Sequence, residues 1–271
     1  MVFLIATGNR LGTMKHDELT CEANEAKCIY LNFNRDVQGL QITDLTVPRS
    51  VRNGSDYVIL DCQYALLPDD LKPDSGLVVK WFYNSIPSPI YQWIPGKKPQ
   101  DLGLLKGRLD LDYRVSDHNS SMYRALFIKT PTTELSGDYK CMVSTYWRED
   151  FMTKRMVVFA PERKMVLHQA KLDLESVNIT CVAQGVYPEP NMSLFKDPDR
   201  KTKLEIENSI VEKNFRNGAY DITASAVIED QNLVTPVIFE CELSIPEARY
   251  YSKKSSVFYP GIMGLVSGKF H

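Results

Sequence analysis

The chain has 271 residues, of which 44% are hydrophobic and 24% are charged, and its formal net charge is −2. This composition excludes a wholly disordered chain, and the length predicts two domains, each large enough to bury its own core. The near-neutral charge provides no basic surface for a polyanion, so we expect no nucleic-acid partner.

The two ends of the chain carry no readable targeting or anchoring segment. No apolar run reaches the roughly 18 residues that span a bilayer, and the stretch 257–266 is broken by Pro260 and two glycines. The apolar start of the chain lacks the basic residues of a secretory leader. Because the rest of the chain has extracellular features, described below, we expect the ends to be incomplete.

Residues 1–40 show no alternation of apolar and polar positions, so we expect an irregular segment there. Cys21 and Cys28 are near enough in sequence to form a local disulfide, and they could equally reach another chain. At the other end, residues 260–271 are expected to form a tail.

Residues 41–160 contain many short stretches with the period-two alternation of β-strands and no convincing helical period. Val58, Leu60 and Cys62 share one face of the first such stretch. Further strands are expected at 77–83, 107–113, 122–129, 137–141 and 151–159. Many short strands separated by loops with proline or glycine are typical of a β-sandwich or a β-barrel.

Four residues in this segment resemble the signature of an immunoglobulin variable-type domain. Cys62 is followed by Trp81, and then by Tyr139 two residues before Cys141. The resemblance implies a disulfide between Cys62 and Cys141 that joins two sheets, with Trp81 packed against it and Tyr139 forming a tyrosine corner. The long gap between the two cysteines leaves room for the extra C′ and C″ strands of this family, and residues 90–95 would be C′.

The sequence departs from this family at Leu135, where an aspartate usually pairs with an arginine at the start of strand D. Arg108 stands at the position of that arginine. We expect either that Glu134 replaces the aspartate or that a hydrophobic contact replaces the ion pair.

Residues 161–259 resemble an immunoglobulin constant-type domain. The stretch that begins at Cys181 reads Cys-x-Ala-x-Gly-x-Tyr-Pro, a pattern of that family. The resemblance implies a disulfide between Cys181 and Cys241 and a cis peptide bond at Tyr187–Pro188. The tyrosine of the corner is replaced by Phe239, and the family's tryptophan is absent.

Four asparagines stand in N-x-S/T triplets without proline, the acceptor pattern for N-linked glycosylation. They are Asn53, Asn119, Asn178 and Asn191. Together with the cysteines, they predict an extracellular or cell-surface compartment. We expect Leu194 to point into the second core, which leaves Asn191 outward and free to carry a glycan.

No pattern for catalysis or cofactor binding is found in the sequence. The four histidines lack zinc-ligand spacing, and neither a nucleophile elbow nor a glycine-rich phosphate loop is present. The acidic pairs Asp69–Asp70 and Glu149–Asp150 are interpreted as solvated loop charges. We therefore predict a protein without enzymatic activity, metal or small-molecule cofactor.

A protein-binding surface is predicted on the first domain. The resemblance to variable-type domains implies that the outer face of strands G, F, C and C′ is the contact surface, and tyrosine, tryptophan and arginine are the residue types most enriched at binding hot spots. The candidate partner-binding residues are Phe82, Trp93, Met142, Tyr146, Trp147 and Arg148. The alternative for Trp147 is that its side chain folds back onto its own sandwich.

These features predict an all-β protein of two tandem immunoglobulin-like sandwiches that acts in extracellular recognition or cell adhesion. The domain order resembles that of invertebrate guidance and adhesion proteins of the beaten-path and sidestep kind, which implies a role in axon guidance. The implied partner is another immunoglobulin-type ectodomain, or a second copy bound through the first domain, with the second domain as a stalk. Two alternatives stay open: a soluble immune-type protein that recognises microbial or glycan ligands, and a structural spacer without a partner.

Overall fold

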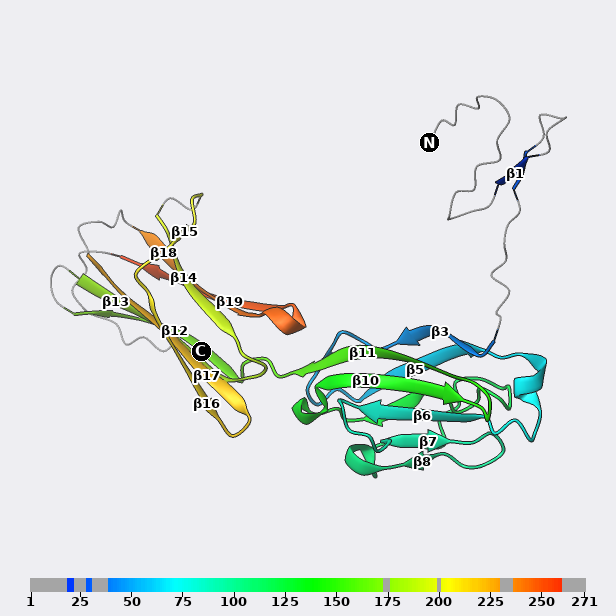
Figure 1. The fold of residues 1–271 in the computed structure, drawn as a ribbon. Helices are drawn as coiled ribbons and strands as arrows, with labels where there is room; N and C mark the ends of the chain where they lie inside the picture. The colour runs from blue at the N-terminus through cyan, green and yellow to red at the C-terminus, as the bar shows by residue number, and fades with distance from the viewer. Residues whose placement is uncertain are drawn as a thin grey trace.

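The structure is a computed structural model that describes residues 19–21, 28–30, 39–172, 176–198, 201–229 and 236–259. Within these residues the regular elements are β-strands and short 3-10 helices. The strands form two sandwiches that follow each other along the chain, the first drawn in blue to green and the second in yellow-green to red (Figure 1). The predicted all-β fold is confirmed.

Two short strands precede the first sandwich and pair with each other: β1 (Leu19–Cys21) and β2 (Cys28–Tyr30). Their antiparallel register sets the backbone of Cys21 opposite that of Cys28. The side chains of these cysteines lie outside the described residues, so the local disulfide stays a prediction. Residues 260–271, the predicted tail, also lie outside them.

The first sandwich consists of a six-stranded and a three-stranded sheet. In spatial order the larger sheet contains β4 (Ser50–Arg52), β11 (Glu149–Phe159), β10 (Gly137–Ser144), β6 (Val78–Tyr83), β7 (Tyr91–Trp93) and β8 (Gln100–Asp101). The smaller sheet contains β3 (Gln41–Thr46), β5 (Tyr57–Ala65) and β9 (Leu126–Lys129). Short 3-10 helices lie in the loops: η1 (Pro68–Leu71), η2 (Gly103–Leu105) and η3 (Thr133–Leu135).

The expected strand at 107–113 is not formed. The segment contains turns and one isolated bridge, from Leu109 to Ile128 of β9. Gly107 opens it with a positive φ of 77°, a conformation that an extended strand does not use. Leu109 is nevertheless buried, so the alternation in this segment reflects one inward anchor rather than a paired strand.

The core of the first sandwich is built around the Cys62–Cys141 disulfide, which links β5 to β10. Trp81 is fully buried, and its Nε1–H donates a hydrogen bond to the carbonyl of Arg124 at 3.1 Å. The hydroxyl of Tyr139 donates to the carbonyl of Leu135 at 2.9 Å, which is the tyrosine corner. A disulfide that closes a loop of 79 residues contributes about 4 kcal/mol in the chain-entropy model.

Arg108 pairs with Glu134, with 2.5 Å between Nη1 and Oε1, while Leu135 is buried in the core. Glu134 therefore replaces the usual aspartate as the partner of Arg108. The hydrogen bond from Arg108 lowers the pKa of Glu134 below its usual value.

The second sandwich consists of two four-stranded sheets. One contains β12 (Lys164–Lys171), β13 (Ser176–Val186), β17 (Ala219–Glu229) and β16 (Ile210–Arg216). The other contains β15 (Leu204–Glu205), β14 (Asn191–Asp197), β18 (Val237–Ile245) and β19 (Tyr250–Phe258). A further 3-10 helix, η5 (Pro246–Ala248), connects β18 to β19.

The core of the second sandwich has its own disulfide, between Cys181 and Cys241. Leu194 and Phe239 are fully buried and Asn191 is exposed, so the inward direction predicted for Leu194 is confirmed. The peptide bond at Tyr187–Pro188 is cis. This core therefore forms without the tryptophan and the tyrosine corner of the first.

The two sandwiches are joined directly at the end of β11. Ala160 forms a backbone bridge to Tyr187, with N···O distances of 2.8 and 3.0 Å. Phe159 lies against Tyr250, with 5.4 Å between the ring centroids. Val157, near the end of β11, packs into the second core.

Candidate protein-binding surface

Apolar side chains gather on the outer face of β6, β10 and β11. Lys140 stands opposite Phe82 across the β6–β10 pair, and Met142 stands opposite Phe151 across the β10–β11 pair. The Nζ of Lys140 lies 4.8 Å from the ring centroid of Phe82 and 5.4 Å from that of Phe151. An exposed cation–π contact contributes about 0.5–1 kcal/mol, so the attraction of this lysine to each ring is modest.

Phe151 is part of this face although the sequence analysis did not select it. Its side chain is 61% exposed. Parity on β11 explains its direction: Phe151 and Met156 are an odd number of residues apart, so they face opposite ways, and the structure buries Met156.

The tip of the hairpin between β10 and β11 presents two aromatic side chains. Tyr146 is 76% exposed and Trp147 is 70% exposed. Their rings contact edge to face, with 5.9 Å between the centroids. Trp147 thus does not fold back onto its own sandwich.

Tyr146 is held against the loop that connects β5 to β6. Its backbone N–H donates to the carbonyl of Ser75 at 2.9 Å, and its ring lies over Gly76. A Cβ on Gly76 would lie 2.8 Å from the ring, and the residue has a positive φ of 72°. Only glycine therefore meets both requirements without strain.

A second contact ties the hairpin to the same loop. The guanidinium of Arg148 lies 3.5 Å from the carboxylate of Asp70, whose side chain is buried. The same carboxylate accepts a hydrogen bond from the N–H of Leu67 at 3.0 Å. On the other side of the hairpin, Asp150 accepts from the N–H of Ile42 at 2.7 Å. The tip is thereby fixed before any partner arrives.

The structure separates the six predicted binding residues into two groups. Phe82 and Met142 lie half-buried on the outer face, and the hairpin supplies Tyr146, Trp147 and Arg148. The sixth, Trp93, does not belong to this surface.

Trp93 is only 1% exposed, which corrects its selection as a binding residue. It stands opposite Val79, and its neighbour Tyr91 stands opposite Trp81. Residues directly opposite each other in an antiparallel pair point to the same face. Since Val79 and Trp81 point into the core, Trp93 does so too.

None of the four sequon asparagines lies on β6, β10 or β11. Asn53 follows β4, Asn119 lies in the loop before β9, Asn178 is on β13 and Asn191 begins β14. Asn178 is half-buried, whereas the other three are exposed. Their glycosylation stays a prediction.

The buried titratable groups of the first sandwich serve the fold. Burial raises the pKa of the Tyr64, Tyr91 and Tyr139 hydroxyls far above the usual value. Each hydroxyl donates to a backbone carbonyl, which suits a permanently protonated group: Tyr64 to Ser120 at 2.6 Å and Tyr91 to Tyr123 at 2.6 Å.

The described residues also bear on metal binding and on membrane insertion. Among these residues, His, Cys, Asp and Glu do not gather in groups of three or more that could hold a metal ion. In the same part of the chain, no helix has the length and apolarity needed to cross a membrane.

The fold is shared with solved structures. Bovine butyrophilin superposes with a TM-score of 0.60 at 17% identity, over 77% of this chain and 93% of that chain. The fold is therefore that of two tandem immunoglobulin-like domains. The extracellular portion of mouse CD200RLa superposes with a TM-score of 0.50 at 17% identity, over 76% of this chain and 95% of that chain. No protein-family model and no curated protein sequence matches the chain.

Proposed function

We propose that this protein is an extracellular recognition or adhesion protein without enzymatic activity. It binds another surface protein through the outer face of β6, β10 and β11 together with the hairpin tip. The observation that carries the proposal is Trp147, a large aromatic side chain that is mostly exposed on a fixed hairpin.

The energetics of binding support this surface. Tryptophan, tyrosine and arginine dominate measured hot spots, and all three stand consecutively at the tip, Tyr146 to Arg148. Ordering a flexible loop upon binding costs about 0.5–1.5 kcal/mol for each side chain that is immobilised. The contacts to Gly76 and Asp70 remove part of that cost, since they hold the hairpin in place in the free protein.

An extracellular location is supported by the two disulfides and by the four sequons. One of the similar structures, that of CD200RLa, is described as an extracellular portion. The proposed partner is another immunoglobulin-type ectodomain, with a second copy of this chain as the homophilic case, and the second domain acts as a stalk. A role in cell adhesion or axon guidance follows from the resemblance of the domain order.

The test is a binding screen of the full chain against a library of extracellular proteins, followed by Trp147→Ala. We expect the substitution to weaken the captured complex by about 2 kcal/mol, a roughly 30-fold rise in Kd. Phe215→Ala is the matched control, because Phe215 is an aromatic residue with 57% exposure in the second domain. The proposal would be contradicted if both variants lost the same amount of affinity, or if neither variant lost any. A chain that captures no protein at all would favour the structural spacer.

A further inference from the structure

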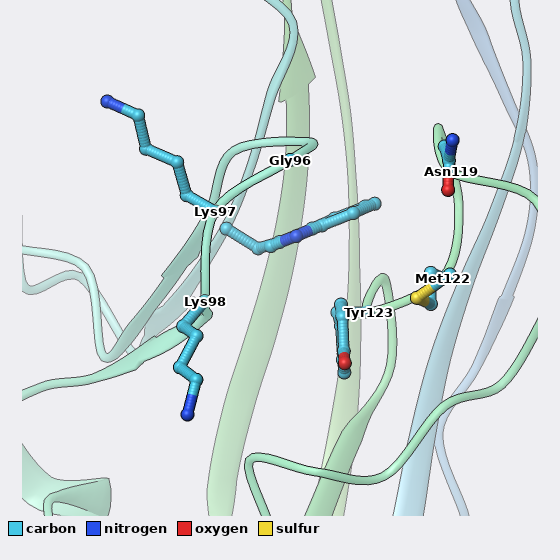
Figure 2. Close-up of a pocket in the computed structure, with 7 residues that line it drawn as sticks. Gly96, Lys97, Lys98, Asn119, Met122 and Tyr123 are labelled. Atoms are coloured by element: carbon cyan, nitrogen blue, oxygen red, sulfur yellow. The ribbon is translucent and has the colours of Figure 1, made fainter.

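A hollow of about 250 Å³ lies on the first sandwich, and no residue of the hairpin tip lines it. It is bounded by the end of β7, the turn that follows it and the loop before β9 (Figure 2). The side chains that line it include those of Trp93, Lys97, Lys98, Asn119, Met122 and Tyr123.

Part of the lining of the hollow is aromatic. The rings of Trp93 and Tyr123 meet edge to face, with 5.8 Å between their centroids. Tyr123 is fixed from two sides, since its carbonyl accepts from the Tyr91 hydroxyl and its own hydroxyl accepts from Nε of Arg114 at 3.1 Å. Figure 2 shows the amino groups of Lys97 and Lys98 on the far side of the hollow from Tyr123 and Met122. The two ammonium groups thus lie apart from the rings of Trp93 and Tyr123, which leave an apolar surface for a ligand.

One residue of the lining, Trp93, has a buried polar atom without a partner. The Nε1 of Trp93 is buried and makes no hydrogen bond within the described residues, whereas the indole N–H of Trp81 donates to a backbone carbonyl. A buried N–H without an acceptor costs about 1–3 kcal/mol. Because less than 1 Å² of this atom is accessible to solvent, a molecule in the hollow does not reach the N–H.

Asn119 stands at the rim and is the acceptor of a sequon. It is exposed, and in Figure 2 it lies on the same side of the hollow as Met122 and Tyr123. None of the side-chain hydrogen bonds found among the described residues engages its amide, so the amide is free to turn toward the hollow. An N-linked sugar would begin at this amide.

We propose that the hollow seats the first N-acetylglucosamine of a glycan carried by Asn119. The apolar face of the sugar ring packs on the wall of the hollow that Tyr123 and Met122 form beside the edge of the Trp93 ring. The linkage joins Asn119 Nδ2 to the anomeric carbon of a lipid-pyrophosphate-linked oligosaccharide: the lipid pyrophosphate leaves, and Nδ2 loses one proton. The proposal rests on the extracellular location proposed above, and it does not depend on the hairpin tip.

The experiment uses the full chain secreted from glycosylating cells, with the glycans mapped by mass spectrometry. One sample is trimmed by an endoglycosidase that leaves a single N-acetylglucosamine on each asparagine, and Asn119→Gln supplies the form without sugar at this position. We expect the single-sugar protein to keep the Tm of the untrimmed protein and Asn119→Gln to lower the Tm by about 4 °C or more. One indole N–H resonance in the ¹⁵N spectrum should also differ between the two forms.

The matched control is Asn53→Gln, since Asn53 lies in an exposed turn beside Gly54, around which a Cβ would meet nothing within 4 Å. This variant should change neither the Tm nor the indole resonances. Two results would overturn the proposed sugar site and leave the proposed function untouched. One is an unmodified Asn119 in a protein that is glycosylated at other sequons, and the other is an equal Tm for the single-sugar and Asn119→Gln forms. A secreted chain with no glycan at any sequon would also remove support for the extracellular location.

Discussion

The two sandwiches reach the same fold with different residues at the centre. In the first, Trp81 packs at the disulfide with its N–H bonded, and Tyr139 closes the corner with its hydroxyl. In the second, Leu194 and Phe239 fill the corresponding space without any polar group. The second sandwich therefore has the fold without this aromatic signature, which in the first sandwich adds hydrogen bonds between loops and the core.

The two sandwiches also expose apolar surface in different ways. The tip of the first is anchored through Gly76 and Asp70, whereas β16 of the second is exposed along its whole length at the edge of its sheet. Scattered exposed apolar residues are normal on protein surfaces. What distinguishes the tip is that its side chains are held in place, and this difference can be tested.

The largest expected effect concerns the two cores. Trp81→Ala should destabilise the first domain by about 3–5 kcal/mol, because it leaves a cavity and removes the donor of the Arg124 carbonyl. Leu194→Ala should destabilise the second domain by about 2–5 kcal/mol. Urea unfolding of the full chain followed by circular dichroism would measure both, with each variant moving only the transition of its own domain.

The control for this comparison is Leu71→Ala, because Leu71 is an exposed leucine of the first domain. It should change the unfolding free energy by no more than about 0.5 kcal/mol. If Trp81→Ala had an effect as small as this control, the indole would not be the centre of the first core.

The anchoring of the tip is tested by Gly76→Ala. The new Cβ would meet the ring of Tyr146 at 2.8 Å, so the ring must move and we expect partner binding to weaken by about 1–3 kcal/mol. Gly96→Ala is the matched variant, since Gly96 also has a positive φ but its Cβ would meet nothing within 4 Å. Calorimetric titration with the captured partner compares the two, and equal losses would mean that backbone strain alone acts.

The smallest expected effect concerns Glu134. Arg108 lowers the pKa of this carboxyl in the folded state, so the pair contributes stability above the unfolded pKa of about 4.3, and this contribution is lost as the pH falls through the lowered value. Glu134→Gln should therefore cost less than about 1 kcal/mol at pH 6, because the pair is exposed to solvent. Unfolding curves of variant and parent should converge in acid, and a constant gap would exclude the ion pair as the cause.

The sequence predicted the strands that have a long alternation of apolar and polar residues and lie at the disulfide. The strands that contain Cys62, Trp81 and Cys141 have long alternating runs, so their inward faces were determined. Strand β7 has only three residues, and a single-residue shift reverses the direction of Trp93, which no local pattern determines.

The supports of the candidate surface were not predictable in the same way. Gly76 and Tyr146 are 70 positions apart, the difference between their residue numbers, and nothing in either local stretch indicates that the ring will lie on the glycine. The burial of Asp70 is equally hidden, because two adjacent aspartates in a loop are typical of solvated charge. Contacts between distant loops follow from the assembled fold.

Because the ring of Tyr146 lies on Gly76, the two loops would have to be transferred together in any engineered binder. A transplant of residues 144–149 onto another sandwich would lose the shape of the hairpin unless residues 67–77 travelled with it, since the glycine and the aspartate that support the hairpin belong to that second segment. Amino-acid substitutions that vary the binding specificity would therefore be tolerated most readily at Trp147, which is exposed at the hairpin tip and does not take part in the contacts to Gly76 and Asp70.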